Sequence, residues 1–292
     1  MNETLATRWD WNDDWPAPAK LNLFLHIVGR RADGYHLLQT VFRFIDYGDS
    51  LRFDPRPDGT IVLATPLPGV ADQAHLAIRA ARALQEATGC TQGASIQLTK
   101  RLPLGGGLGG GSSDAATTLL ALNHLWRTGL GSAALQRIGL VLGADVPVFV
   151  FGRAAFAEGV GEQFIPVQPA PAWYLVVTPP VSVPTAEIFA SSALRRNTLP
   201  IEPATWHDGF GSNDMESVAC ALYSPVARCL EALRTHGDAR MSGSGASCFV
   251  AFSEQIEATA ALSALQLEIP GINGFIAKGL DCHPLLALNE AD

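Results

Sequence analysis

The chain has 292 residues, of which 48% are hydrophobic and 16% charged, so it is long enough for one or two domains with a substantial core, and wholesale disorder is excluded. Its formal net charge of −8 argues against a general nucleic-acid surface. Five scattered cysteines without a CxxC pair predict reduced thiols, and no apolar run approaches the length of a membrane span. We expect a cytoplasmic monomer or weak homodimer without nucleic-acid or membrane partners.

The N-terminal part of the chain predicts strands followed by helices. Residues 1–14 are typical of a loose tail, although Trp9 and Trp11 could dock on the rest of the protein. Alternation of side chains predicts strands over the segments 21–28, 37–48, 50–53, 60–64 and 95–99. Helices are predicted over 72–89, 112–129 and 132–143, the second with serines able to cap it and an acid in its first turn.

Six prolines between Pro166 and Pro184 mark a candidate domain boundary. We therefore predict one domain over 15–165 and a second over 166–292. Whether the last strand returns to the first domain is left open. The apolar run after Asp145 leads into strand-like sequence up to Ile165. In the second domain, helices are predicted around 185–194, 213–223 and 225–236, and strands over 173–178, 247–252 and 273–278. The last two strands flank a helix and predict a βαβ unit.

The most unusual segment is PLGGGLGGGSSDAA, from Pro103 to Ala116, in which six of the seven residues from Gly105 to Gly111 are glycine. So many glycines weaken any strand or helix interior, so the exposed backbone must serve another purpose. A flexible linker is one interpretation. The segment lies between a predicted strand and a predicted helix, however, where linkers are uncommon.

Three phosphate-binding interpretations compete for this loop. Gly105, Gly107 and Gly110 satisfy the dinucleotide fingerprint GxGxxG, but the acid expected about 20 residues further on is missing. The spacing of a Walker A loop also fits, but Ser112 stands where its lysine must reach the phosphates. The third interpretation is a glycine-rich loop that directs backbone N–H groups at an anion and leads into a helix N-terminus. We favour the third, in which the two serines cap the helix, bind phosphate or help to hold a metal ion.

This glycine loop resembles the phosphate-binding motif of the GHMP kinase superfamily. Two further signatures of that superfamily have matches in PAKLNLFL, at Pro18–Leu25, and MSGSGASCFVAF, at Met241–Phe252. The segments PAPAKLNLFLHIVGRRADGYHLLQTVFRFIDYGD, LGADVPVFVFGRAAFAEGVGE and NGFIAKG are similar to one branch of the superfamily, whose acceptor is a cytidine-diphosphate-linked methylerythritol. The resemblance runs from Trp15 to Leu286.

The resemblance implies a two-domain α+β fold with mixed or antiparallel sheets, a ferredoxin-like second domain and an active site in the interdomain cleft. It implies ATP and Mg²⁺ as cofactors. The implied reaction is phosphorylation of the acceptor's 2-hydroxyl in non-mevalonate isoprenoid precursor biosynthesis. Two alternatives stay open: another GHMP kinase with a mevalonate-like or homoserine-like acceptor, and a catalytically silent nucleotide-binding protein with this fold.

Lys20 and Asn22 lie on one side of the first predicted strand because strand side chains alternate. From the residues alone, they are either a strand end in solvent or buried polar groups that need partners. Asp145 follows a helix stop and either caps a turn or takes part in chemistry. The resemblance implies that Lys20 and Asp145 are catalytic, with Asp145 as the base, and that Asn22 lies beside the lysine. Phosphoryl transfer requires mainly positioning and charge neutralisation, so a weak base suffices.

Tyr35 and His36 follow a predicted turn and either pack together or offer a ring face and a polar edge to a nucleobase. The resemblance implies that Tyr35 stacks on cytosine, that His36 bonds to its edge and that Phe189 supplies the opposite face. The loop Gly243–Gly245, with Ser244 at its centre, is either a tight turn or, as the family implies, a wall of the acceptor site. In the second case it packs against the phosphate loop.

Lys100, one of three lysines against seventeen arginines, opens the glycine loop and is either a surface lysine or a nucleotide contact. The resemblance favours the contact. The complete set of residues expected at the nucleotide is Lys100, Pro103, Leu104, Gly105, Gly106, Gly107, Leu108, Gly109, Gly110, Gly111, Ser112 and Ser113.

Two features depart from the family pattern. His75 stands where relatives commonly have an asparagine on the nucleotide side, which leaves the adenine or ribose contact open. No acid occupies the magnesium-binding glutamate position of several relatives, so the metal ligands are unknown, and phosphates, water and a serine are the candidates. Asn213, Asp214 and Glu216 match a helix start of the family, and we expect them to cap that helix.

Overall fold

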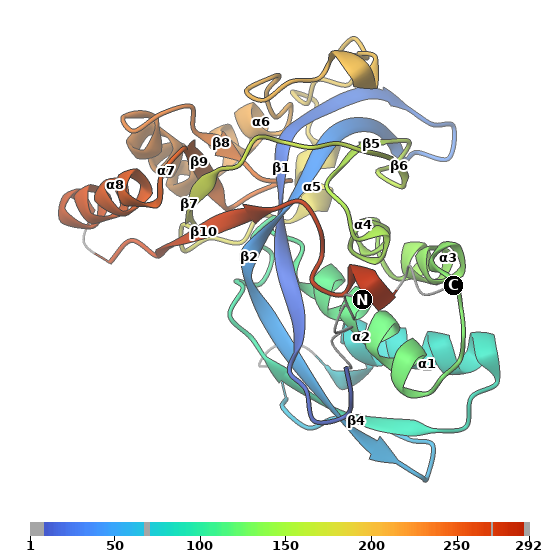
Figure 1. Ribbon diagram of the computed structural model, residues 1–292. Helices are drawn as coiled ribbons and strands as arrows, with labels where there is room; N and C mark the ends of the chain where they lie inside the picture. Colours follow the sequence, from blue (N-terminus) through green and yellow to red (C-terminus); the bar gives the residue numbers. More distant parts are fainter. Residues whose placement is uncertain (1–8, 67–70, 270, 289–292) are drawn as a thin grey trace, which may run out of the picture.

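The computed structural model describes residues 9–66, 71–269 and 271–288 (Figure 1). The predicted α+β class is confirmed, with a mixed sheet and helices packed beside it. Strands and helices up to residue 166 are β1 (Trp15–Arg30), β2 (His36–Arg56), β3 (Ile61–Leu63), α1 (Leu76–Thr88), β4 (Gly93–Thr99), α2 (Gly110–Leu125), α3 (Ser132–Leu142), α4 (Val146–Phe151), β5 (Ala155–Glu158) and β6 (Gln163–Pro166). Those that follow are β7 (Trp173–Val177), α5 (Thr185–Ala190), α6 (Glu216–Leu222), α7 (Ser224–Arg234), β8 (Arg240–Met241), β9 (Cys248–Phe252), α8 (Gln255–Glu268) and β10 (Gly274–Leu280).

The main path of the sheet runs β3-β4-β2-β10-β7-β9-β8, and β1 and β5 pair with β2 beside it. β3 and β4 are parallel, whereas β1 and β2 form a long antiparallel ribbon. The first predicted strand extends further at both ends, and the two segments predicted at 37–48 and 50–53 are one strand, β2. The register of its pairing with β1 shifts between Pro18 and Ala19. The two predicted segments are therefore separated by an irregularity within one strand, and the strand does not end between them.

The second half has the order β10-β7-β9-β8, in which β7 lies between β9 and β10 and is antiparallel to both. The predicted βαβ unit is therefore present as β9, α8 and β10, split by β7. This arrangement is ferredoxin-like, as the resemblance implied. At Gly279 and Leu280, β10 leaves β7 and pairs with β2, so the last strand joins the two halves of the sheet.

Two large apolar clusters lie on opposite sides of this junction. One is built around α1–α4 and includes Trp15, Phe44 and Phe53, all fully buried. The other lies around β7, β9 and α7, with Leu175 and Leu230 at 0% exposure. Figure 1 shows the corresponding helices in two groups, α1–α4 beside one end of the β1–β2 ribbon and α7 and α8 beside β9. No helix among the described residues is long and apolar enough to span a membrane.

One segment agrees with an option that the sequence left open, and another differs from the expectation. Within residues 1–14, Trp9 and Trp11 dock on the first cluster, and the Trp9 ring lies 5.0 Å from that of Trp15. Residues 1–8 lie outside the described part. The apolar run Val146–Phe151 forms the helix α4, which was not predicted. Its six residues are too few for periodicity to distinguish a helix from a strand, and Pro147 in the first turn suits a helix start.

His283 is buried in the first cluster region and gives a pH-dependent contribution to stability. Its Nδ1 accepts a hydrogen bond of 3.1 Å from the Leu285 amide, its Nε2 has no partner among the described residues, and burial lowers its pKa to about 3 from 6.5. The unfolded chain takes up a proton at this residue as the pH falls through 6.5, whereas the folded protein does not until about pH 3. Stability is therefore lost across that window as the pH falls.

We expect His283→Asn to remove this acid-side loss, because an asparagine Oδ1 also accepts from the amide two residues on but takes up no proton. Well below pH 6.5, the free energy of unfolding of the variant should fall less steeply than that of the parent, by about 1.4 kcal/mol per pH unit. Urea unfolding at several pH values measures this difference. The exposed residue His207, replaced by asparagine, serves as the control, and parallel curves for parent and His283→Asn would contradict the assignment.

Candidate active site

A cavity of about 940 Å³ collects most of the predicted site residues. It runs from the glycine loop and Asp145, past β1 and β2, to α5 and the loop at Gly243. Among the residues predicted to contact the nucleotide or the acceptor, Ser113 and Gly245 do not line it. The predicted residues that do line it are Lys20, Asn22, Tyr35, His36, Lys100, all residues from Pro103 to Ser112, Asp145, Phe189, Gly243 and Ser244.

The glycine loop alternates between two backbone conformations. Gly105, Gly107 and Gly109 have φ values of 66°, 75° and 74°, whereas the residues between them have no positive φ. Such alternation forms concave arrangements of successive N–H groups that suit anions. At Gly107 a Cβ atom would lie 2.2 Å from the Ser242 carbonyl oxygen, so only glycine fits this close approach. The loop therefore needs its glycines both for conformation and for space.

The helix that follows begins at Gly110, with Gly109 as its N-cap and no side-chain capping bond. The predicted capping by serines is wrong, and Asp114 lies beyond the first turn. Ser113 is fully buried, and its Oγ donates to the Pro18 carbonyl at 2.7 Å, so this side chain is turned away from the cavity. Ser112 remains at the cavity, beside first-turn amides that have no intrahelical acceptor.

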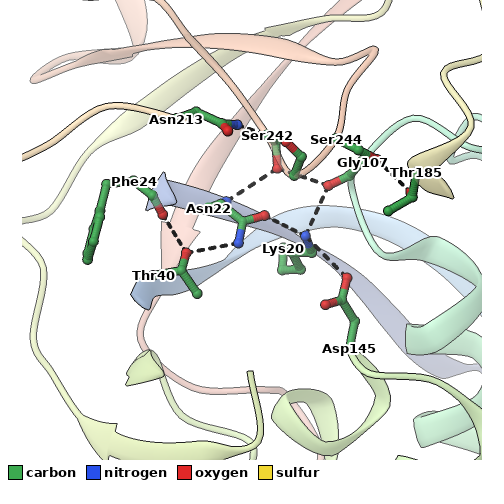
Figure 2. A network of polar contacts seen from close by, with 11 residues as sticks. Lys20, Asn22, Phe24, Thr40, Gly107, Asp145, Thr185, Asn213, Ser242 and Ser244 are labelled. Carbon is green, nitrogen blue, oxygen red and sulfur yellow. Dashed lines mark hydrogen bonds and ion pairs between the residues drawn. The ribbon is translucent and has the colours of Figure 1, made fainter. Parts of the chain in front are cut away.

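Lys20 and Asp145 meet at the mouth of this loop (Figure 2). The Lys20 Nζ lies 3.3 Å from an Asp145 oxygen and donates to Asn22 Oδ1 at 2.6 Å and to the Gly107 carbonyl at 3.1 Å. The lysine side chain is 3% exposed and the aspartate 37%, so a buried cation orients a carboxylate that faces the cavity. Asp145 precedes α4, yet its side chain makes no capping bond. The alternative of a simple turn cap therefore receives no support.

Asn22 is held in one orientation by the polar network of Figure 2. Its Nδ2 donates to Thr40 Oγ1 at 2.9 Å, and Thr40 in turn donates to the Phe24 carbonyl. An ammonium group only donates, so the Asn22 oxygen must face Lys20. The burial of Lys20 and Asn22, each 2% exposed, also decides against the alternative of a strand end in solvent.

Lys100 lines the cavity but is tied down by two carboxylates that the sequence interpretation missed. Its Nζ contacts Asp49 at 2.5 Å and Asp114 at 2.9 Å. The other Asp49 oxygen accepts from the amides of Arg101 and Leu102, which fixes the entry to the glycine loop. Burial raises the pKa of Asp114 to about 7. Neither aspartate was recognisable from the sequence, because Asp49 follows a turn-like glycine and Asp114 resembles an ordinary helix acid.

At the far end of the cavity, His36 rather than Tyr35 packs on Phe189. The His36 and Phe189 rings are stacked, with centroids 4.5 Å apart and an interplanar angle of 15°. Tyr35 is 64% exposed. Arg196, which the sequence interpretation did not single out, donates to His36 Nε2 at 3.1 Å. The three predicted ring residues, Tyr35, His36 and Phe189, therefore all line this end of the cavity, and Arg196 contacts His36.

The second small-residue loop packs against the glycine loop, as Figure 2 shows around Gly107. Ser242 Oγ donates to the Gly107 carbonyl at 2.9 Å, and the Ser244 hydroxyl is bonded to that of Thr185 at 2.7 Å. Asn213 Nδ2 donates to the carbonyls of Met241 and Gly243, both at 2.8 Å, so it supports this loop besides bonding to the start of α6.

Three predicted residues have roles in the framework. Gly245, with φ +93°, lies in the turn behind the cavity, where a Cβ would approach the Met241 sulfur to 2.8 Å. The His75 side chain caps α1 by accepting from the Ala77 amide at 3.2 Å, and this residue does not line the cavity. The Asp214 carboxylate accepts from the Ile27 amide and does not cap a helix.

Within the described ranges, no group of three or more His, Cys, Asp or Glu side chains is placed to hold a metal ion. A magnesium ion that travels with a nucleotide needs only one or two protein oxygens, since phosphates and water supply the others. The Ser112 hydroxyl and the partly exposed Asp145 carboxylate are protein oxygens at the cavity that fit this chemistry.

Comparisons with known proteins show the family to which the chain belongs. Residues 75–153 match the model of the GHMP kinases N-terminal domain, and residues 194–270 match that of the GHMP kinases C-terminal domain. A 4-diphosphocytidyl-2-C-methyl-D-erythritol kinase of Dechloromonas aromatica is 58% identical over 276 residues, which cover 94% of this chain and 100% of the relative. The chain belongs to the 4-diphosphocytidyl-2-C-methyl-D-erythritol kinase family of GHMP kinases. A family member from Halorhodospira halophila is 55% identical and covers 95% of this chain and 96% of its own length.

Solved structures extend the comparison to the fold. A crystal structure of 4-(cytidine 5′-diphospho)-2C-methyl-D-erythritol kinase has a TM-score of 0.78 and 33% identity, and covers 91% of this chain and 99% of its own. The mevalonate kinase of Methanococcus jannaschii has a TM-score of 0.64 at 14% identity, covering 92% of this chain and 98% of its own, which shows the shared fold alone. Members of this family are ATP-dependent kinases that act on a small-molecule alcohol, and the predicted enzyme class is confirmed.

Proposed function

We propose that the protein transfers the γ-phosphoryl group of ATP to the 2-hydroxyl of 4-diphosphocytidyl-2-C-methyl-D-erythritol, in isoprenoid precursor biosynthesis. The relatives that carry this enzyme's name, at 50% to 58% identity over nearly the whole chain, support the substrate. The observation that carries the chemistry is the Lys20–Asp145 pair at the edge of the glycine loop, inside a cavity whose other end is aromatic.

The glycine loop would bind the triphosphate. Backbone N–H groups from Gly105 to Ser112 meet the anion together with the positive end of the α2 dipole. Lys100 stands at the loop entry, where its ion pairs with Asp49 and Asp114 keep the ammonium in place. When bound, Mg²⁺ would neutralise charge on the phosphates, with the Ser112 hydroxyl as a protein ligand.

Asp145 would act as the base in the transfer step. It accepts a hydrogen bond from the acceptor's 2-hydroxyl and takes its proton as the new oxygen–phosphorus bond forms and the bond to the leaving ADP oxygen breaks. Lys20 is held between Asn22, Gly107 and Asp145, so its charge would already be in place beside Asp145 when the acceptor binds. Little rearrangement is then required at the moment of transfer.

The aromatic end of the cavity would bind the cytidine. Phe189 and Tyr35 offer ring faces, and His36 offers a polar edge. Gly243 and Ser244 would form the wall beside the methylerythritol, because their loop is bonded both to the glycine loop and to α5. The proposal includes a cytoplasmic location. It also includes a monomeric or weakly dimeric state, and light scattering in solution would test this oligomeric state.

The proposed activity predicts that ADP release with ATP, Mg²⁺ and the cytidyl acceptor exceeds that with mevalonate or homoserine by about 100-fold or more in kcat/KM, because a site built to hydrogen-bond one substrate rejects analogues that leave its polar groups unpaired. A coupled assay on purified protein measures all three acceptors under the same conditions. Preference for mevalonate or homoserine would indicate another GHMP kinase. Nucleotide binding without transfer to any acceptor would indicate a silent member of the fold.

A further inference from the structure

Arg196 holds the aromatic end of the cavity together through four hydrogen bonds. Its guanidinium donates to the backbone carbonyls of Phe189, Ser191 and Leu194 at 2.7, 2.8 and 2.9 Å. The fourth bond runs from Nε to the His36 Nε2 at 3.1 Å. Three carbonyls from the end of α5 and the segment after it therefore fix the plane of the guanidinium, and this plane in turn fixes the imidazole.

The contact also fixes the position of the proton on His36. A guanidinium nitrogen only donates, so the Nε2 atom must be the acceptor and the imidazole proton must be on Nδ1. Protonation of the ring would place two N–H groups against each other. Burial, together with the charges of Arg196 and Arg30, lowers the pKa of His36, which keeps the ring neutral at physiological pH.

The resulting Nδ1–H group is available to a ligand. Within the part of the chain that the structure describes, His36 bonds to Arg196 through Nε2 and stacks on Phe189, and no protein hydrogen bond involves its Nδ1. His36 lines the cavity. The aromatic end thus carries one N–H donor whose direction is set by its neighbours.

We propose that Arg196 is a positioning residue that determines base specificity: it holds His36 as an Nδ1–H donor for the N3 atom of cytosine and thereby disfavours uracil. The inference rests on the proposed function for the nature of the acceptor. Cytosine carries a lone pair at N3, whereas uracil carries an N–H there, so uracil would bring two donors together. Without Arg196, the imidazole is free to adopt the other tautomer and to accept from uracil.

The test compares two acceptors that differ only in the base, the cytidyl compound and its uridyl counterpart. We expect the wild-type ratio of kcat/KM values to favour the cytidyl acceptor by about 10- to 100-fold, the range of one well-placed base contact. In Arg196→Met the ratio should fall by about 10-fold, through KM for the acceptor, while KM for ATP stays unchanged. Arg195→Met removes the same charge from the neighbouring exposed residue and should leave the ratio as it is. An equal loss for both acceptors in Arg196→Met would overturn the inference and assign Arg196 a purely structural role.

A spectroscopic measurement on the wild-type protein requires neither turnover nor a stable variant. ¹⁵N NMR of the His36 imidazole should show a protonated Nδ1 and an unprotonated Nε2, and cytidine diphosphate should bind more tightly than uridine diphosphate. An Nε2–H ring, or equal affinity for the two diphosphates, would overturn the inference. Failure of the wild-type protein to phosphorylate the cytidyl acceptor would instead refute the proposed function, and the tautomer and the binding ratio would still decide the role of Arg196.

Discussion

Replacing Asp145 with asparagine is expected to lower kcat by about 100-fold or more, because the amide keeps the shape of the side chain but accepts no proton. In the structure an Asp145 oxygen lies 3.3 Å from Lys20 Nζ and makes no capping bond to α4. Lys20 keeps its bonds to Asn22 and Gly107 in the variant, so the surrounding framework should remain intact. Steady-state kinetics with the cytidyl acceptor measures the effect.

The expected signature of Asp145→Asn is a loss in kcat with KM for ATP nearly unchanged, since the carboxylate is proposed to act on the acceptor hydroxyl and not on nucleotide binding. Asp238→Asn is a matched control, because that carboxylate is 71% exposed and pairs with Arg240 outside the cavity. Undiminished phosphoryl transfer in Asp145→Asn would mean that another group takes the proton. The mechanism proposed above would then be wrong.

Gly107→Ala is expected to abolish most nucleotide binding and to destabilise the protein by more than about 2 kcal/mol. A left-handed backbone costs alanine about 1 kcal/mol, and the new methyl group would in addition meet the Ser242 carbonyl oxygen at 2.2 Å. Relief of that contact requires the two loops to separate, which displaces the N–H groups proposed to bind phosphate. KM for ATP and the urea midpoint measure the two effects.

Gly129→Ala separates conformational strain from the steric clash. Gly129 has a similar φ of 69°, but a Cβ at this position would meet no atom of the described residues within 4 Å. This variant should lose only about 1 kcal/mol of stability and retain its affinity for ATP. If the two alanine variants behaved alike, the close approach of Gly107 to Ser242 would have no functional importance.

Structural features that depend on residues close together in the sequence could be predicted. The glycine loop, its position between a strand and a helix, and the pairing of Lys20 with Asn22 on one strand face all depend on spacing over a few residues. The apolar run that forms α4 was too short for its periodicity to be informative. The proposed base, Asp145, could be interpreted chemically only through the family resemblance, because its contact with Lys20 joins residues 125 positions apart.

What sequence reasoning missed depends on contacts between distant segments. Asp49 and Asp114 meet Lys100 only in the folded chain, and Arg196 reaches His36 across 160 residues. Ser113 was expected at the nucleotide because it follows the glycines, yet helix geometry turns its hydroxyl toward the Pro18 carbonyl. In each case the residue type was visible, but its partner was not.

The long β1–β2 ribbon would set a fixed length for the acceptor in the proposed binding mode. Lys20 lies within β1, and Arg30 at the end of the same strand pairs with His36 at the start of β2. The reacting end of the cavity and its aromatic end are therefore connected by a hydrogen-bonded ladder, which does not stretch as a hinge between domains does. If the acceptor binds as proposed, the ribbon would select for its length, and a cytidine compound with a shorter linker would fill the aromatic end while its hydroxyl stopped short of Asp145.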